Sequence, residues 1–208
     1  EQAETCCCSW KPAGPAPPRT APPVHSGTDV LPIDRFKQQV VALTFPSIAS
    51  TDPRIETASA AATILGGDNS MFFWNIVQKG LAPRAGAQHL DFTDCGVMIL
   101  YAACQPDRCE EVLAAMRREA GRMCEERVSK HEVDRVKNKR RTSLAVEAEA
   151  PYYRLTQLMD DMEDYGAPRT IEETLTDVDA VSAVTIQQYL QACPINIPGH
   201  LASVGPRN

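Results

Sequence analysis

The sequence predicts an α+β fold in which an antiparallel β-sheet is covered by helices on one face. Short apolar runs of strand length occur together with longer segments whose apolar residues recur at helical spacing. Within residues 84–104 the period changes to that of two adjacent strands. The resulting order is strand, helix, helix, two strands, several helices and strand, which is typical of α+β domains.

Residues 35–208 are expected to form one domain, preceded by a leader at residues 1–34. A chain of 208 residues is long enough to bury a core of its own. Because the first residue is Glu1 and not methionine, we expect a fragment or a processed product, with residues 1–10 as the tail of a preceding element. Prolines remove amide donors, so the rest of the leader is expected to be an extended linker outside any sheet interior. Its prolines are Pro12, Pro15, Pro17, Pro18, Pro22, Pro23 and Pro32.

The domain is expected to begin with a strand and two helices. Residues 38–45 form an apolar run that predicts a buried strand, which stops at Pro46. Residues 51–53, Thr-Asp-Pro, offer a cap and a proline at the first position of a helix. This helix is expected to end at Gly66, because glycine is a common helix stop. A second, short helix is expected over residues 72–80.

The second part of the domain is expected to contain a hairpin, several helices and a last strand. Residues 84–104 predict two antiparallel strands, and Pro106 opens a long amphipathic helix. A later helical stretch is broken at Pro151, and residues 201–206 predict a closing strand. Two capping boxes mark the starts of further helices, Ser129 with Glu132 and Thr170 with Glu173.

The composition excludes several classes of protein. With 43% apolar and 23% charged residues, the chain has the mix of an ordinary globular domain. The formal net charge of −6 disfavours a nucleic-acid partner, because binding to phosphates needs a basic face. The basic run at residues 137–141 lies in an acidic helical pattern and is expected to be a solvated face. The longest apolar run, residues 97–104, is too short to span a membrane, so no membrane partner is expected.

Eight cysteines raise the question of a metal or disulfide framework. They never form the Cys-x-x-Cys pairs that bind zinc or carry out thiol exchange. Without a secretory signal, we expect reduced thiols and a cytoplasmic location. Cys104 and Cys124 fall on apolar faces and are expected in the core. A thiol enzyme is disfavoured, because the sequence suggests no pairing of a cysteine with a histidine base.

The order and spacing of several short motifs support a family resemblance that extends from about Trp10 to the end of the chain. They are the strand ending in Phe45-Pro46, the Leu-Gly-Gly turn at residues 65–70, the Gly-Leu-Ala turn at residues 80–82, the helix start at residues 129–132 with residues 137–139, and the ending at residues 204–206. In these features the chain resembles the C-terminal repeat of insulinase-type zinc metallopeptidases. This family includes pitrilysin, insulin-degrading enzyme and the mitochondrial processing peptidase.

The resemblance implies the half-domain of such a peptidase that carries no zinc. In this family two similar α+β halves face each other across a chamber, and His-x-x-Glu-His in one half binds the metal. The chain lacks that motif, and the nearest approach, His131-Glu132, fails because Arg135 takes the place of the second ligand of His-Glu-x-x-His. Zinc is therefore expected in a partner, an N-terminal zinc-binding half-domain or subunit. The chain alone is expected to be inactive, and isolated copies could pair as homodimers.

The resemblance also places the substrate-holding segment of the chain, which would contact a peptide in the chamber. The residues expected to bind substrate are Gly66, Gly67, Asn69, Ser70, Gly80, Leu81, Ala82 and Arg84. The glycines would let an extended peptide pass close to the backbone. An alternative remains open, because Gly-Gly after a helix most often serves as a helix stop.

Two polar residues of the family pattern are missing from this segment. In the family an arginine and a tyrosine help to stabilise the oxyanion of the transition state. Here the arginine position falls on Ile76, or on Val77 if one residue is deleted, and the tyrosine position falls on Pro83. Either a different cation such as Arg84 or Lys79 takes over, or the protein is a catalytically inactive scaffold or assembly subunit with the same fold.

Overall fold

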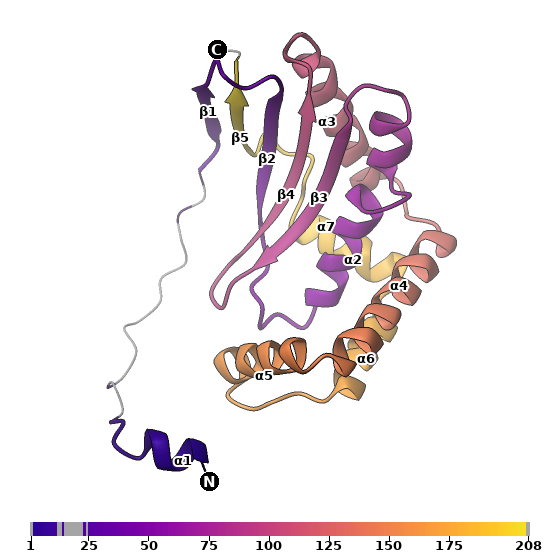
Figure 1. Ribbon diagram of the computed structural model, residues 1–208. Helices are drawn as coiled ribbons and strands as arrows, with labels where there is room; N and C mark the ends of the chain where they lie inside the picture. The colour runs from indigo at the N-terminus through magenta and orange to yellow at the C-terminus, as the bar shows by residue number, and fades with distance from the viewer. Residues whose placement is uncertain (1, 12–13, 15–22, 24, 207–208) are drawn as a thin grey trace.

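The computed structural model describes residues 2–11, 14, 23 and 25–206 (Figure 1). Most prolines of the expected linker, at positions 12, 15, 17, 18 and 22, lie outside these residues, as does Glu1. A short helix, α1, precedes the linker, and five strands and several further helices follow it (Figure 1). The strands are β1 (Gly27–Pro32), β2 (Gln39–Ser47), β3 (Arg84–Asp91), β4 (Gly96–Cys104) and β5 (His200–Gly205). The α-helices are α1 (Gln2–Cys7), α2 (Ile55–Gly66), α3 (Cys109–Glu125), α4 (Lys130–Glu149), α5 (Pro151–Tyr165), α6 (Ile171–Ala180) and α7 (Ala183–Ala192).

The strands form one sheet in the order β1-β5-β2-β4-β3. The pairs β5–β2, β2–β4 and β4–β3 are antiparallel, which confirms the α+β prediction, but β1 lies parallel to β5 at the far edge. The sheet thus begins at Gly27, within the segment expected to be linker. β1 is exposed along its whole length and ends at Pro32, a residue that edge strands tolerate.

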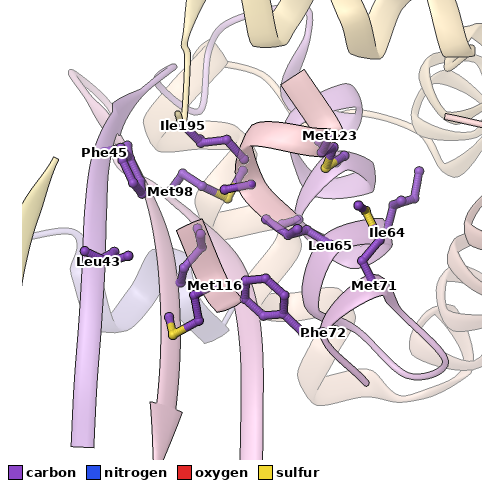
Figure 2. Close-up of a cluster of buried hydrophobic side chains, with 14 of the residues drawn as sticks. Leu43, Phe45, Ile64, Leu65, Met71, Phe72, Met98, Met116, Met123 and Ile195 are labelled. Carbon is purple, nitrogen blue, oxygen red and sulfur yellow. The ribbon is translucent and has the colours of Figure 1, made fainter. Parts of the chain in front are cut away.

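The core lies between one face of the sheet and the helices, which Figure 1 shows on the same side. Alternate residues of β2 and β4 point into it, as expected for strands with one buried face. Figure 2 shows Leu43, Phe45 and Met98 from the sheet beside Leu65 of α2 and Met116 of α3. On the opposite face Val40 and Tyr101 are exposed. The prediction of helices on one face is therefore confirmed.

The start of α2 is later than its sequence predicts. The helix begins at Ile55, because Asp52 forms a local turn and does not cap a helix that starts at Pro53. Its carboxylate accepts a hydrogen bond from the main-chain N–H of Arg54, at 2.8 Å, and pairs with the Arg54 guanidinium at 2.7 Å. Such side-chain bonds compete with helix formation. The end of α2 at Gly66 is as expected.

The capping boxes at the starts of α4 and α6 are both confirmed. At α4, the hydroxyl of Ser129 accepts from the N–H of Glu132, and the Glu132 carboxylate accepts from the N–H of Ser129. A third box, between Ser182 and Thr185, starts α7. Sequence analysis missed it because threonine replaces the usual glutamate or glutamine at the third helical position.

The two cysteines expected in the core are located there. Cys104 on β4 is fully buried, and burial raises its pKa to about 11. Cys124 on α3 is partly buried and packs against the core. All eight cysteines are free thiols. Within the part of the chain that the structure describes, no helix is long and apolar enough to cross a membrane.

Candidate functional site

Gly66 brings the end of α2 into direct contact with the backbone of β3. A Cβ atom at this position would lie 1.8 Å from the main-chain nitrogen of Ala87. Because the clash is with backbone, no change of side-chain conformation could remove it. Neither Gly66 nor Gly67 has a positive φ, whereas Asn69 does, with φ 53°. Gly66 is therefore needed for close helix–strand packing and not for a left-handed helix stop.

The turn after α2 is bound to α4 through its own polar groups. Arg135 donates through Nη1 to the carbonyl oxygens of Asp68, at 2.7 Å, and of Asn69, at 2.8 Å. Lys139 donates to the Asp68 carboxylate at 2.7 Å, and this hydrogen bond lowers the pKa of Asp68. The carbonyl oxygens of Asp68 and Asn69 therefore already have a hydrogen-bond donor within the chain, and the turn is fixed to α4.

A short helical segment at residues 71–79 joins this turn to the next one. Ser70 is 2% exposed, and its hydroxyl accepts a hydrogen bond from the N–H of Phe73 at 3.1 Å. The segment contains a π-helical stretch, Phe73–Val77, and the N–H of Leu81 donates to the carbonyl of Ile76 at 3.0 Å. Such wider turns are rare and occur often at functional sites.

The second turn is likewise fixed by a contact from a distant helix. Gly80 has φ 68°, a conformation that glycine adopts without strain, and its carbonyl oxygen accepts from Nη1 of Arg108 at 2.6 Å. Ala82 is 1% exposed, and Leu81 packs partly buried against the core. Arg84 starts the edge strand β3 and is exposed.

The two turns lie at opposite ends of the 71–79 segment. Of the expected side chains, Asn69 and Arg84 carry polar groups that are exposed. Asn69 and Ser70 line a hollow of about 480 Å³ beside the first turn. The other residues lining it include Trp74, Arg122, His131 and Arg135.

A buried carboxylate anchors the 71–79 segment to α3. Glu119 is 2% exposed, and its Oε2 accepts from Nδ2 of Asn75 at 3.0 Å and lies 3.3 Å from Nη2 of Arg122. Nε of Arg118 donates to its other oxygen at 3.4 Å. The contacts of Glu119 and Arg135 could not be predicted from the sequence, because their partners lie on other elements, 44 and 67 residues away.

The positions where the resemblance places an arginine and a tyrosine have contrasting environments. Ile76 is fully buried in the core, while Pro83 is exposed. Among the aromatic residues nearby, Phe72 is fully buried and Trp74 is 55% exposed. An arginine at position 76 would point into the core of this chain, so the missing cation is not simply restored at that place.

The histidines do not gather into a metal site. Among the described residues, no group of three His, Cys, Asp or Glu side chains is arranged to hold a metal ion. His131 lies exposed in the first turn of α4. The side chain of His89 is 2% exposed, and its Nε2 lies 2.8 Å from Oγ of Ser47. Burial lowers the pKa of His89, which favours the neutral ring.

Comparison with known proteins gives one family match. The sequence pattern of the family described as peptidase M16 inactive domain matches residues 1–140. An uncharacterized zinc protease of Rickettsia bellii is 27% identical over 154 residues, which cover 74% of this chain and 37% of that protein. The mitochondrial-processing peptidase subunit beta of Pongo abelii is 28% identical over 115 residues, covering 55% of this chain and 23% of that protein. The chain thus spans well under half of the length of these relatives.

Solved structures share the fold at low sequence identity. A peptidase M16 inactive domain from Pseudomonas fluorescens superposes with a TM-score of 0.80 at 17% identity, covering 94% of this chain and 48% of that one. A putative zinc protease from Bordetella pertussis gives a TM-score of 0.70 at 19% identity, covering 80% of this chain and 93% of that one. The fold described above is therefore that of these structures.

Proposed function

This chain belongs to the peptidase M16 family as an inactive domain, and we propose that it is the non-catalytic, substrate-holding half of a zinc metallopeptidase. The observation that carries this proposal is the family match over residues 1–140 together with a fold shared along 94% of the chain with a solved inactive domain. Peptide hydrolysis would then need a partner half that carries His-x-x-Glu-His.

The donor groups of the chain do not fit a zinc ion, so zinc is proposed to lie in the partner half. Zinc sites need three or four nitrogen, sulfur or oxygen ligands around one point. In the described residues, His89 bonds to Ser47 and His200 to Asp29, at opposite sides of the sheet. When bound in the other half, zinc polarises the scissile carbonyl and activates water.

The substrate-holding role is proposed for the exposed part of the two glycine turns and for β3. β3 is an edge strand that pairs with β4 alone, and Arg84 stands exposed at its start. An extended peptide can add to such an edge through main-chain hydrogen bonds. Asn69 and Arg84 would contact the peptide, and Gly80 leaves space for it, while Gly66, Gly67, Ser70, Leu81 and Ala82 shape the turns.

A second function, that of a scaffold or assembly subunit, is favoured by one observation. The position of the family's arginine holds Ile76, or Val77 if one residue is deleted, and that of its tyrosine holds Pro83. Ile76 is fully buried. Loss of an oxyanion donor typically lowers the rate about 10²- to 10³-fold, which need not abolish cleavage when zinc is present. Activity of the assembled complex therefore distinguishes the two functions.

Peptide cleavage by the two halves, separately and combined, tests the proposal. We expect cleavage of a fluorogenic peptide only by the combination, and we expect the Asn69→Ala and Arg84→Ala variants to raise KM several-fold with less effect on kcat. Arg117→Ala is the matched control, because Arg117 is exposed on α3 and does not line the hollow beside the first turn. Cleavage by the zinc half alone at the same rate would favour the scaffold function.

The compartment is also part of the proposal. Eight free thiols, including Cys6 and Cys8, which are exposed, suit a reducing compartment such as the cytoplasm. Thiol labelling of the native protein from cells measures this, and we expect all eight cysteines to be reduced. A disulfide between any two of these cysteines would contradict it.

A further inference from the structure

Helix α5 presents a row of large apolar side chains to solvent. Tyr152 is 76% exposed, Leu155 56%, Met159 63% and Met162 53%. Their spacing of three, four and three residues places them on one side of the helix, within an arc of about 80°. Single exposed apolar residues are ordinary, but a continuous row of this kind marks an interaction surface.

Two further exposed apolar side chains lie where α4 meets α5. Val146 and Tyr153, 65% and 59% exposed, line the same hollow of about 350 Å³ between the two helices. The rings of Tyr152 and Tyr153 meet edge to face, with centroids 6.1 Å apart. We call the row of Tyr152, Leu155, Met159 and Met162 the α5 face.

The α5 face is turned away from the domain's own core. In Figure 1, α5 extends from the lower end of α4 and lies beyond the end of the sheet, and its main packing partner is α4. One hydrogen bond ties the inner side of α5 to the domain, and a second ties it to the turn that follows the helix. The hydroxyl of Tyr165 donates to the carbonyl of Ser50 at 2.9 Å, and the Asp161 carboxylate accepts from the N–H of Arg169 at 2.9 Å.

An acidic hollow lies beside the α5 face. It has a volume of about 740 Å³, between α5 and the turn that joins β3 to β4. Burial, and then the nearby carboxylates, raise the pKa of Asp160 at its wall. The acidic residues that line the hollow are Asp91, Asp94, Asp160, Glu163 and Asp164.

A buried hydroxyl lies in the wall of the hollow. Ser50 is 7% exposed and lines the hollow, and its Oγ has no hydrogen-bond partner among the described residues. Buried polar side-chain atoms in proteins nearly always have a partner. A hydroxyl without one, next to several carboxylates, suits a ligand group that carries both N–H donors and positive charge, such as a lysine or arginine side chain.

We propose that the α5 face and the acidic hollow together dock the zinc-bearing half of the same peptidase. The docking surface of that half would be an apolar patch with a lysine or arginine beside it. This inference rests on the proposed function for the existence of the zinc-bearing half. The chain covers only 37% of the Rickettsia bellii zinc protease, so a protein of that length has room for a second unit of similar size.

The charges disfavour a second copy of this chain as the occupant. In a twofold-symmetric contact the same patch meets itself, so two α5 faces would bring two acidic hollows close together. Like charges that meet across an interface cost affinity. A partner with basic side chains beside its apolar patch has no such penalty.

The affinity between the two halves tests this docking site. For Leu155→Glu combined with Met159→Glu we expect binding at least about thirtyfold weaker, as for residues at the centre of an interface. Val184→Glu is the matched control, because Val184 is 53% exposed on α7. This variant should bind the zinc-bearing half with unchanged affinity. For Asp160→Lys with Asp164→Lys we expect about tenfold weaker binding that depends less on salt.

Unchanged affinity of the folded Leu155→Glu/Met159→Glu variant would overturn the docking site. Light scattering that shows a dimer of this chain, lost in the same variant, would assign the face to a second copy and would also overturn it. Binding and cleavage are measured separately, so failure of the two inferences can be told apart. A complex that binds through the α5 face but cleaves no peptide would refute the peptidase function and leave the docking site intact.

Discussion

The glycine turns and helix α5 differ in how much of their surface is free to bind a partner, and the difference is the opposite of what their sequences suggest. The turn at residues 66–70 has the pattern of a ligand-binding loop, yet its carbonyl groups at Asp68 and Asn69 are occupied by Arg135. The sequence of α5 is that of an ordinary amphipathic helix, yet Tyr152 and Met159 are largely exposed. A glycine motif therefore indicates which backbone conformation or close packing is required locally, whereas exposed apolar side chains in the fold indicate a surface that can bind a partner.

Placing an arginine where the family has one should have the largest effect on stability. Ile76→Arg would put a charge into the fully buried site of Ile76, and we expect a loss of about 3–5 kcal/mol in the free energy of unfolding. Trp74→Arg is the control, because Trp74 lies in the same segment and is 55% exposed. Chemical denaturation of both variants measures the difference. Equal stability of the two variants would mean that Ile76 is not buried as described here.

Adding one methyl group at Gly66 should have the next largest effect. The Cβ of Gly66→Ala would collide with the backbone of Ala87, so α2 must move away from β3, at a cost of about 2–3 kcal/mol. Gly121→Ala makes the same change inside α3, where no atom lies within 4 Å, and should be neutral or stabilising by up to about 1 kcal/mol. Thermal unfolding of the pair gives the comparison. A Gly66→Ala protein as stable as the parent would show that α2 does not pack so closely against β3.

Removing the bonds that hold the first turn should have a smaller effect. Arg135→Met keeps much of the side-chain volume but leaves the carbonyls of Asp68 and Asn69 to water, and we expect a loss of about 1–2 kcal/mol. Hydrogen exchange of the amides at residues 67–70 should become faster in this variant. Arg117→Met is the control. No change in exchange would show that the turn is rigid without Arg135.

The smallest effect should be a loss of stability at mildly acidic pH that comes from His89. Burial lowers the pKa of His89 in the folded state below the usual histidine value of 6.5, so below that pH the unfolded state binds a proton that the folded state does not. Stability should therefore fall as the pH drops through 6.5, and should stop falling once the pH passes the folded pKa. Urea denaturation between pH 7.5 and pH 5 measures this slope, and His89→Asn should reduce it. An equal slope in both proteins would contradict the assignment to His89.

The part of the fold that depends on neighbouring residues could be predicted from the sequence. The boxes at Ser129 and Thr170 need residues only three positions apart, and both are present. The insertion of β5 between β1 and β2 pairs residues more than 150 positions apart, such as Val40 with Val204, and no local pattern encodes it. The need for glycine at position 66 likewise comes from the backbone of β3, which is distant in the sequence.

The candidate site was predictable to a lesser degree. Turns lie within residues 65–70 and 80–82, where they were expected, and their role in binding peptide stays a prediction. The residues that fix them, Arg135 and Arg108, come from other helices. The positions of the aromatic residues and methionines of α5 were readable, but their exposure depends on how α4 and α5 pack in three dimensions.

The metal content of the two separated halves tests most directly that this chain is the non-catalytic half. Mass spectrometry of the metals in the purified complex, and then in each half, is the measurement. The account predicts stoichiometric zinc in the complex and in the partner half, and none in this chain, in which the described residues hold no group of three metal ligands. Tightly bound, stoichiometric zinc in this chain would contradict it.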